Sequence, residues 1–201
     1  MKNNTGTWLP DGDTFFEHMG DYESHDYAHL LPYISKRNVA IDIGAHVGYW
    51  SRRLVRDFNH VYAFEAESEH IECLRANVTE PNITITQVAL SNESGTLKFS
   101  KTLENSGMSR IADEGIDIQC EPLDRWNIDE VDLIKIDVEG HELNVLRGAE
   151  QTILRNRPVV FMEILNSAPA DTRNGILGLL TAWKYELKLI VDENYIFVSA
   201  E

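Results

Sequence analysis

Cysteine is scarce in this sequence of 201 residues, where only Cys73 and Cys120 occur. Two cysteines cannot build the disulfide framework of a small secreted protein or the ligand set of a zinc ribbon, so we expect a reducing compartment. Long apolar runs are also missing, because stretches such as 159–162 fall far short of the roughly 18 residues of a membrane span. Residues 1–13 lack the apolar core of a signal peptide. Together these absences predict a soluble cytoplasmic protein with no membrane partner.

Basic residues are also few: 18 Lys and Arg oppose 33 Asp and Glu, which gives a net charge of −15. Nucleic acids are bound by clustered Lys and Arg, and here the basic residues are scattered, so we expect no nucleic-acid partner. Neither proline nor glycine gathers into a linker, and no repeat is visible. We therefore predict a single domain over 1–201, with a helical N-terminal cap in 1–38 and a core in 39–201.

Short apolar runs alternate with helical periodicity from residue 39 onward, which is typical of βαβ units. The expected strands cover 39–43, 61–64, 83–88, 131–138 and 159–164, followed by a terminal hairpin of 187–191 and 195–198. The expected helices cover 47–58, a segment with Ser68 as its N-cap, 143–153 and 176–183. The pattern predicts an α/β fold with a mostly parallel sheet and helices on both faces.

Two further segments stand outside this alternation. Short β runs at 95–100 and 116–120 flank the small, polar loop 105–109, which predicts a β insertion between strands three and four and a mobile lid. In the cap, apolar residues at helical spacing predict an amphipathic helix that packs over the open crevice of the sheet. These residues are Phe15, Phe16, Tyr27, Leu30, Leu31 and Ile34.

The first expected strand leads into DIGAHVG, where Gly44 and Gly48 allow a tight turn at the position where open α/β sheets bind ligands. The loop lacks the second glycine of the dinucleotide fingerprint, and Asp42 would repel a diphosphate but attract an ammonium or sulfonium group. Glu65 ends the next strand, at the place from which a carboxylate binds the ribose hydroxyls of a nucleoside. Both carboxylates suit a cationic adenosyl ligand.

Four segments in this order, AIDIGAHVGYWS, YAFEA, QVALSNESGTLKF and DLIKIDVEGHELNVLRGAE, make the sequence similar to the FkbM-type family of class I methyltransferases that use S-adenosylmethionine. The resemblance implies a Rossmann-like, seven-stranded sheet with one antiparallel strand, and O-methylation of a hydroxyl on a small molecule or glycan. His46 stands where the family often has Asn. By this resemblance the cofactor-binding set is Asp42, Gly44, Ala45, His46, Gly48, Tyr49, Glu65, Ala66, Gln87, Val88 and Ala89.

The segment KIDVEGHE supplies the candidates for chemistry. Strand alternation places Lys135, Asp137 and Glu139 on one side, at the carboxyl edge of the sheet. A hydroxyl acceptor must lose its proton during transfer, and His141 can serve as the base, with Asp137 or Glu139 orienting it or acting instead. Each residue also has a structural interpretation: Lys135 and Asp137 as an ion pair, Glu139 and His141 as caps of the next helix.

Two groups of residues have the side chains of metal ligands, but we expect no metal. Asp137, Glu163 and Asn166 resemble the ligands of divalent-metal-dependent catechol-type methyltransferases, although carboxylates at strand ends are common without metal. His25 and His29 share a helical face but lack a third ligand. Two rival functions stay open: an NAD(P)-dependent Rossmann oxidoreductase, which the missing glycine and Asp42 disfavour, and a non-catalytic protein that binds an adenosyl ligand.

Overall fold

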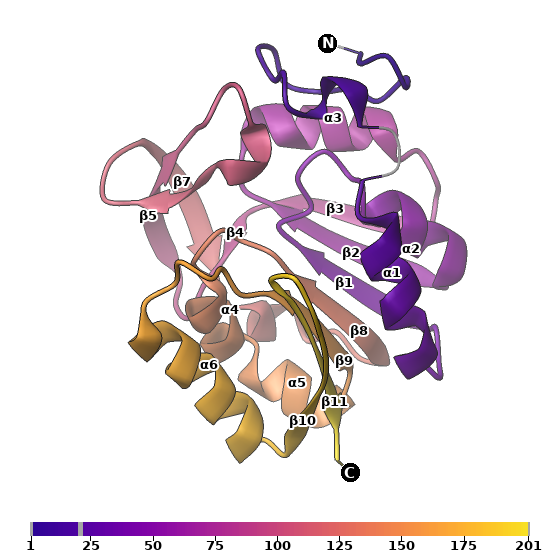
Figure 1. Ribbon diagram of the computed structural model, residues 1–201, viewed down its shortest axis with the longest axis vertical. Helices are drawn as coiled ribbons and strands as arrows, with labels where there is room; N and C mark the ends of the chain where they lie inside the picture. The colour runs from indigo at the N-terminus through magenta and orange to yellow at the C-terminus, as the bar shows by residue number, and fades with distance from the viewer. Residues whose placement is uncertain (1, 20–21, 201) are drawn as a thin grey trace.

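A computed structural model describes residues 2–19 and 22–200 of the chain. Its centre is a seven-stranded sheet with the order β10-β11-β9-β8-β1-β2-β3 (Figure 1). The strands are β1 (Val39–Ile43), β2 (His60–Glu65), β3 (Ile83–Gln87), β8 (Val131–Ile136), β9 (Val159–Glu163), β10 (Tyr185–Val191) and β11 (Asn194–Ser199). β11 runs antiparallel to both of its neighbours, and all other pairs are parallel. The predicted α/β class and the single antiparallel strand are confirmed.

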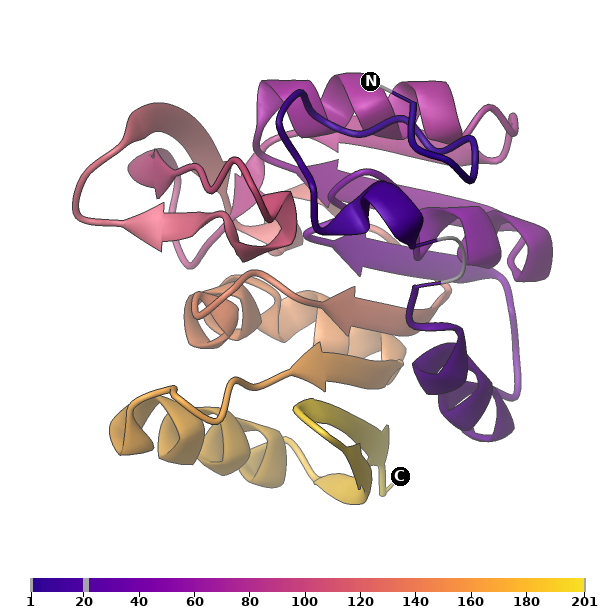
Figure 2. The ribbon, with the colours of Figure 1, turned by 45° about the horizontal axis from the view of Figure 1, so that its top comes forward.

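Helices cover both faces of this sheet, because successive side chains of each strand point to opposite faces (Figures 1 and 2). Ile41 and Ile43 of β1 pack into a core shared with α4 (Glu142–Gly148), α5 (Glu150–Asn156) and α6 (Ala170–Ala182). Ala40 belongs to the opposite core, which is shared with α1 (Ser24–Leu30), α2 (Ser51–Asp57) and α3 (Ser68–Asn77). In the described part of the chain no helix is long and apolar enough to cross a membrane.

The β insertion between β3 and β8 is larger than the two short strands that the sequence predicts. It forms a second sheet of order β4-β7-β5-β6, with a 3-10 turn, η3 (Ser106–Met108), inside the predicted lid loop. The strands are β4 (Ala89–Leu90), β5 (Gly95–Ser100), β6 (Arg110–Ala112) and β7 (Ile116–Glu121). Figure 2 shows this insertion standing beside the carboxyl ends of β1 and β2.

Several helix boundaries differ from those predicted. The expected helix 143–153 is two helices that meet at Ala149, where Gly148 lies so close to the Ser91 carbonyl oxygen that a Cβ would stand 2.0 Å from it. α2 begins only at Ser51, because residues 44–50, which we call the glycine loop, occupy the expected first turn. Glu67, not Ser68, is the N-cap of α3, and its carboxylate accepts a hydrogen bond from the backbone N–H of His70.

The N-terminal segment also differs from prediction, since no single helix covers the crevice. α1 packs beside α2 through an edge-to-face contact of Tyr27 with Trp50, whose ring centroids lie 5.5 Å apart. The neighbouring 3-10 turns, η1 (Phe16–His18) and η2 (Leu31–Tyr33), are short. Phe16 is buried as expected, but Phe15 is 43% exposed and lies at the rim of the pocket.

Candidate functional site

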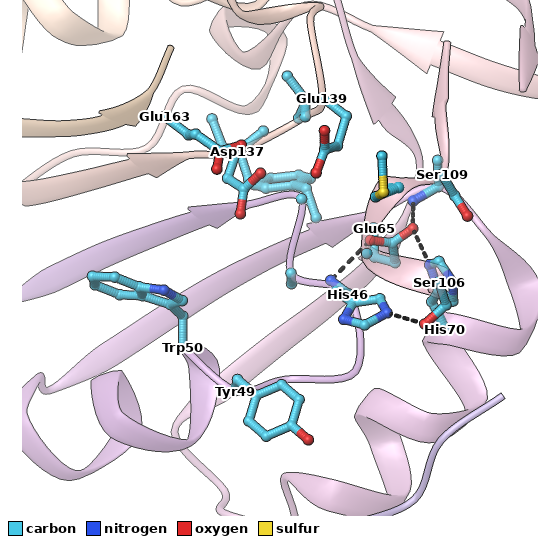
Figure 3. A pocket seen from close by; sticks show the side chains of 18 of the residues that line it. His46, Tyr49, Trp50, Glu65, His70, Ser106, Ser109, Asp137, Glu139 and Glu163 are labelled. Atoms are coloured by element: carbon cyan, nitrogen blue, oxygen red, sulfur yellow. Dashed lines mark hydrogen bonds and ion pairs between the residues drawn. The ribbon is translucent and has the colours of Figure 1, made fainter. Parts of the chain in front are cut away.

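A pocket opens at the carboxyl ends of β1, β2, β8 and β9, where open α/β sheets bind their ligands. Its walls come from the glycine loop after β1, the end of β2, residues 88–90, the lid loop, the end of β8 and the N-terminal segment. Figure 3 shows His46 and Glu65 on one side and Asp137, Glu139 and Glu163 on the other. We name the two ends of the pocket after the ligands that the sequence predicts for them: the adenosyl end, around Glu65, and the acceptor end, around Asp137.

The glycine loop forms the floor between these two ends. Gly44 has a positive φ of 73°, and a Cβ there would stand 1.8 Å from the Asp137 carbonyl oxygen, so only glycine fits. The backbone N–H groups of Gly44 and Ala45 donate to the carbonyl of Phe64. Gly48 does not line the pocket; its close neighbour is Leu74 of α3, 2.6 Å from a Cβ position, which makes it a packing glycine.

Glu65 is a fixed, ionised carboxylate at the adenosyl end, only 6% exposed. One oxygen accepts from the backbone N–H of His46 at 2.9 Å, and the other accepts from Ala66 and Glu67 at 2.8 and 2.9 Å. Burial alone would raise the pKa of Glu65, but the hydrogen bond and charge of His70, 3.3 Å away, and the backbone donors lower it below its usual value. The residue therefore presents a rigid anion to a ligand.

Two other predicted cofactor residues lie outside the pocket wall. Asp42 is fully buried, and its carboxylate accepts from Ser51 Oγ at 2.7 Å and lies 3.6 Å from Lys135 Nζ. Its charge therefore acts on the pocket through Lys135, not by direct contact. Gln87 is exposed at the end of β3, whereas its neighbours Val88 and Ala89 do line the pocket.

The predicted catalytic residues meet at the acceptor end. Asp137, Glu139 and Glu163 each offer an oxygen within 4.8 Å of the others. Lys135 Nζ lies 3.2 Å from Asp137 and donates to the carbonyl of Gly44 at 3.0 Å. Burial alone would lower the pKa of Lys135, but the charges of Asp137 and Asp42 raise it above its usual value. The lysine is therefore a buried, permanent cation that already has two anionic partners.

Crowding of carboxylates changes their proton affinity at this end. Burial and the charge of Asp137 raise the pKa of Glu163 to about 10, and the same two causes raise that of Glu139 to about 7. Glu23 joins the group from the N-terminal segment: burial, then Asp137, raises its pKa to about 7, and its carboxylate accepts a hydrogen bond from the indole N–H of Trp50. The carboxylates at this end therefore have a raised proton affinity, which is highest at Glu163.

The candidate metal ligands of the sequence come together only in part. Asp137 and Glu163 lie together with Glu139, whereas Asn166 does not line the pocket and its backbone N–H donates to the Glu193 carboxylate. Carboxylate oxygens are the ligands that hard divalent cations prefer. The rings of His25 and His29 are 4.2 Å apart, and among the described residues they belong to no group of three metal-ligating side chains.

His141 lines the pocket, and both of its ring nitrogens have protein partners. Nε2 lies 2.9 Å from Ser91 Oγ, and Nδ1 lies 3.3 Å from Asn144 Nδ2. Burial lowers its pKa below the usual value, so the ring is neutral. One of these contacts must break before His141 can take a substrate proton, whereas the Glu139 carboxylate faces the pocket without such a need. His141 is the N-cap residue of α4, but its side chain makes no capping hydrogen bond.

Several pocket residues carry no signal in the sequence. Glu23 and Tyr22 come from a segment without a recognisable motif, and Ser106 reaches the pocket from the insertion. Only the small, polar composition of 105–109 pointed to that loop. His70 lies one helical turn beyond the N-cap of α3, and only its contact with Glu65 in the folded chain gives it a role.

Comparisons with known proteins agree with this geometry. The methyltransferase FkbM domain family matches residues 42–187 of the chain. A hexuronic acid methyltransferase, AglP of Haloferax volcanii, is 28% identical over 178 residues, which cover 83% of this chain and 72% of that protein.

Solved structures show the same fold at low sequence identity. Methyltransferase FkbM from Methylobacillus flagellatus KT has a TM-score of 0.60 at 18% identity, covering 81% of this chain and 43% of that one. The chain thus spans less than half the length of that structure. Precorrin-6y C5,15-methyltransferase from Geobacter metallireducens GS-15 has a TM-score of 0.54 at 13% identity, covering 85% and 84%. Both likenesses support the Rossmann-like fold of class I methyltransferases.

Proposed function

The chain belongs to the FkbM methyltransferase family, and on that premise we propose that it uses S-adenosylmethionine to O-methylate a hydroxyl of a small molecule or glycan. The observation that carries the proposal is the pairing of Glu65, which three backbone N–H groups hold at one end of the pocket, with the crowded carboxylates of Asp137, Glu139 and Glu163 at the other. The first is suited to binding a nucleoside, and the second to moving a proton.

The pocket residues fit the chemistry of the cofactor. Glu65 is placed to accept hydrogen bonds from the ribose hydroxyls, and Val88 and Ala89 to border the adenine. The Gly44 loop gives the methionine part close access to the backbone, and the carboxylates beyond it suit an ammonium and a sulfonium charge. When bound, S-adenosylmethionine supplies an electrophilic methyl group; the chain's own task is alignment and removal of the acceptor proton.

Glu139 is the base that we propose for this task. Its pKa of about 7 leaves a large fraction ionised near neutral pH, while the proton affinity is high enough to accept a proton from a hydroxyl as that oxygen gains the methyl group. Asp137, held by Lys135 at 3.2 Å, orients the neighbouring groups. Product release then returns the proton to solvent.

The charge of the acceptor end favours a neutral acceptor. Glu23, Asp137, Glu139 and Glu163 line it, and the one lysine among the described lining residues already contacts Asp137 and Asp42. A uronate would bring a further anion without a free cationic partner, which costs free energy in a buried site. The relative from Haloferax volcanii is a hexuronic acid methyltransferase; for this chain we propose a neutral hydroxyl acceptor.

A methyl-transfer screen with labelled S-adenosylmethionine tests this function. The panel contains neutral sugars, amino sugars, uronic acids, phenols, and RNA as a control, and we expect label in a neutral hydroxyl compound. Calorimetry with S-adenosylmethionine and with NADH runs in parallel. Binding of NADH alone would replace the proposal with an oxidoreductase, and adenosyl binding without transfer to any acceptor would favour a non-catalytic protein.

A further inference from the structure

Asp13 is a buried carboxylate that joins two distant segments above the pocket. It is 1% exposed. Its Oδ1 accepts from the backbone N–H of Phe16 at 2.9 Å, and its Oδ2 accepts from both the backbone N–H, at 2.9 Å, and the hydroxyl of Ser106. The contacts with Ser106 join residues that are 93 apart in the sequence. A buried anion is costly unless hydrogen bonds satisfy it, so this arrangement strongly fixes the position of Ser106.

The same contact joins the N-terminal segment to the lid loop. The backbone N–H groups of Thr14 and Phe15 donate to the carbonyl of Glu104 at 3.1 and 3.0 Å. Phe16 lies beneath Gly107, where a Cβ would stand 3.1 Å from its ring. Residues 13–16 and 104–109 therefore form one unit, the cover, over the adenosyl end.

Ser106 also contacts the ring of His46, and a dashed line in Figure 3 marks this hydrogen bond. The Ser106 hydroxyl donates to Asp13, so its oxygen offers a lone pair to His46 Nε2, 2.6 Å away. Burial, with smaller effects of His70 and Lys135, lowers the pKa of His46 well below its usual value, so the ring is neutral. A neutral imidazole carries one proton. That proton must lie on Nε2, which leaves Nδ1 as a hydrogen-bond acceptor.

The unprotonated Nδ1 is open to a ligand. His46 lines the pocket, and no described group forms a hydrogen bond with its Nδ1. Nδ1 is also not among the fully buried side-chain atoms that lack a hydrogen-bond partner, so it is accessible. The backbone N–H of the same residue holds Glu65, so its ring stands beside the carboxylate that suits a ribose.

We propose that Asp13 is a positioning residue for cofactor binding, which acts through Ser106 to hold His46 as the Nε2–H tautomer, with Nδ1 accepting a hydrogen bond from a hydroxyl of the adenosyl ligand beside Glu65. The proposal rests on the adenosyl site of the proposed function. It assigns to the chain an Asp–Ser–His relay that spans the cover and the glycine loop.

Two measurements on the full chain test the relay. Nitrogen-15 NMR of labelled histidine reports the tautomer of His46 without any ligand. Calorimetry with S-adenosylhomocysteine reports binding without turnover. In the wild type we expect the proton on Nε2. In Ser106→Ala we expect a mixed tautomer and binding weaker by about 3–10-fold, the range for loss of one hydrogen bond.

The variants are chosen so that folding does not decide the outcome. Ser106→Ala keeps the backbone bond to Asp13, whereas Asp13→Asn places an amide donor against two donors and can disturb the fold. Glu104→Gln is the control, because it changes an exposed side chain of the cover and keeps the carbonyl that binds Thr14 and Phe15. We expect wild-type binding and tautomer in that control.

The outcomes separate the relay from the proposed function. A wild-type His46 with its proton on Nδ1 overturns the relay. Weaker binding by Ser106→Ala with an unchanged tautomer also overturns it, because the serine then acts only as a latch of the cover. Failure of the wild type to bind S-adenosylhomocysteine refutes the proposed function, while the NMR result still decides the tautomer.

Discussion

The two ends of the pocket hold their carboxylates in opposite ways. At the adenosyl end Glu65 accepts from three backbone N–H groups and lies beside His70, so its charge is satisfied before any ligand arrives. At the acceptor end Glu163 has a buried oxygen without a hydrogen-bond partner, and it shares its space with Glu139 and Asp137. The first end is preorganised to bind, and the second has the perturbed proton affinities that are typical of a reactive site.

The largest effect that we expect comes from the acceptor end. At least one of Glu139→Gln, Asp137→Asn and His141→Ala should bind S-adenosylmethionine normally yet lose at least about a hundredfold in methyl transfer, the lower range for loss of a general base. The contacts of His141 with Ser91 and Asn144 make Glu139 our first choice. Single-turnover rates and calorimetry on each variant measure the two effects separately. If all three keep more than about a tenth of the rate, the base lies elsewhere.

At the adenosyl end we expect a loss of binding, not of chemistry. Glu65→Ala should weaken S-adenosylmethionine binding by about 1.5–3 kcal/mol, the contribution of hydrogen bonds to a charged group. We expect the same range for Asp42→Ala, which acts through Lys135. Circular dichroism checks that each variant folds. Native spectra with unchanged affinity for Glu65→Ala would remove the ribose assignment and with it the contrast between the two ends.

The sequence predicted where Glu65 and Gly44 lie in the fold better than it predicted the contacts of the cover above them, for a physical reason. Glu65 and Gly44 follow directly from strand ends, because hydrophobic alternation locates β1 and β2 and the sheet brings their carboxyl ends together. The Asp13 contact with Ser106 joins residues 93 apart, and no local pattern encodes such a pair. The break between α4 and α5 could not be predicted for the same reason, because Gly148 packs against Ser91, which is far from it in the sequence.

The pH dependence of the rate sharpens the comparison. If Glu139 is the base, it must be ionised, and its pKa is raised to about 7 by burial and by Asp137. The maximal rate should therefore rise about tenfold per pH unit below 7 and level off above it. Glu65 should stay ionised over the same range, because its pKa is lowered, so S-adenosylmethionine affinity should change only through the acceptor-end carboxylates and by less than the rate does. A flat profile for the wild type would argue against Glu139.

Stability should respond to pH through the acceptor end. The pKa of Glu163 is raised in the folded state by burial and by Asp137, so the folded chain retains a proton that the unfolded chain releases. Its stabilising contribution is present below the unfolded pKa and is lost as pH rises toward the folded value of about 10. Glu163→Gln should therefore raise the melting temperature at pH 8 relative to wild type by about 2–4 °C, with a smaller gain at pH 5. Differential scanning calorimetry at both pH values measures this, and equal shifts would contradict it.

The smallest effect that we expect is that of chelators on the acceptor end. Asp137, Glu139 and Glu163 have the oxygen ligands for a divalent cation. However, Lys135 Nζ already stands 3.2 Å from Asp137, and Glu163 retains a proton at neutral pH, because its pKa is raised to about 10 by burial and by Asp137. A cation would have to displace that proton and lie beside the ammonium group, which opposes its binding. EDTA should therefore change the methyl-transfer rate by less than about twofold, because the proton on Glu163 and the ammonium group of Lys135 weaken the binding of a divalent cation. A rate that falls in EDTA and returns with Mg²⁺ would instead make the three carboxylates a metal centre, and the proton on Glu163 would then be the group that the metal replaces.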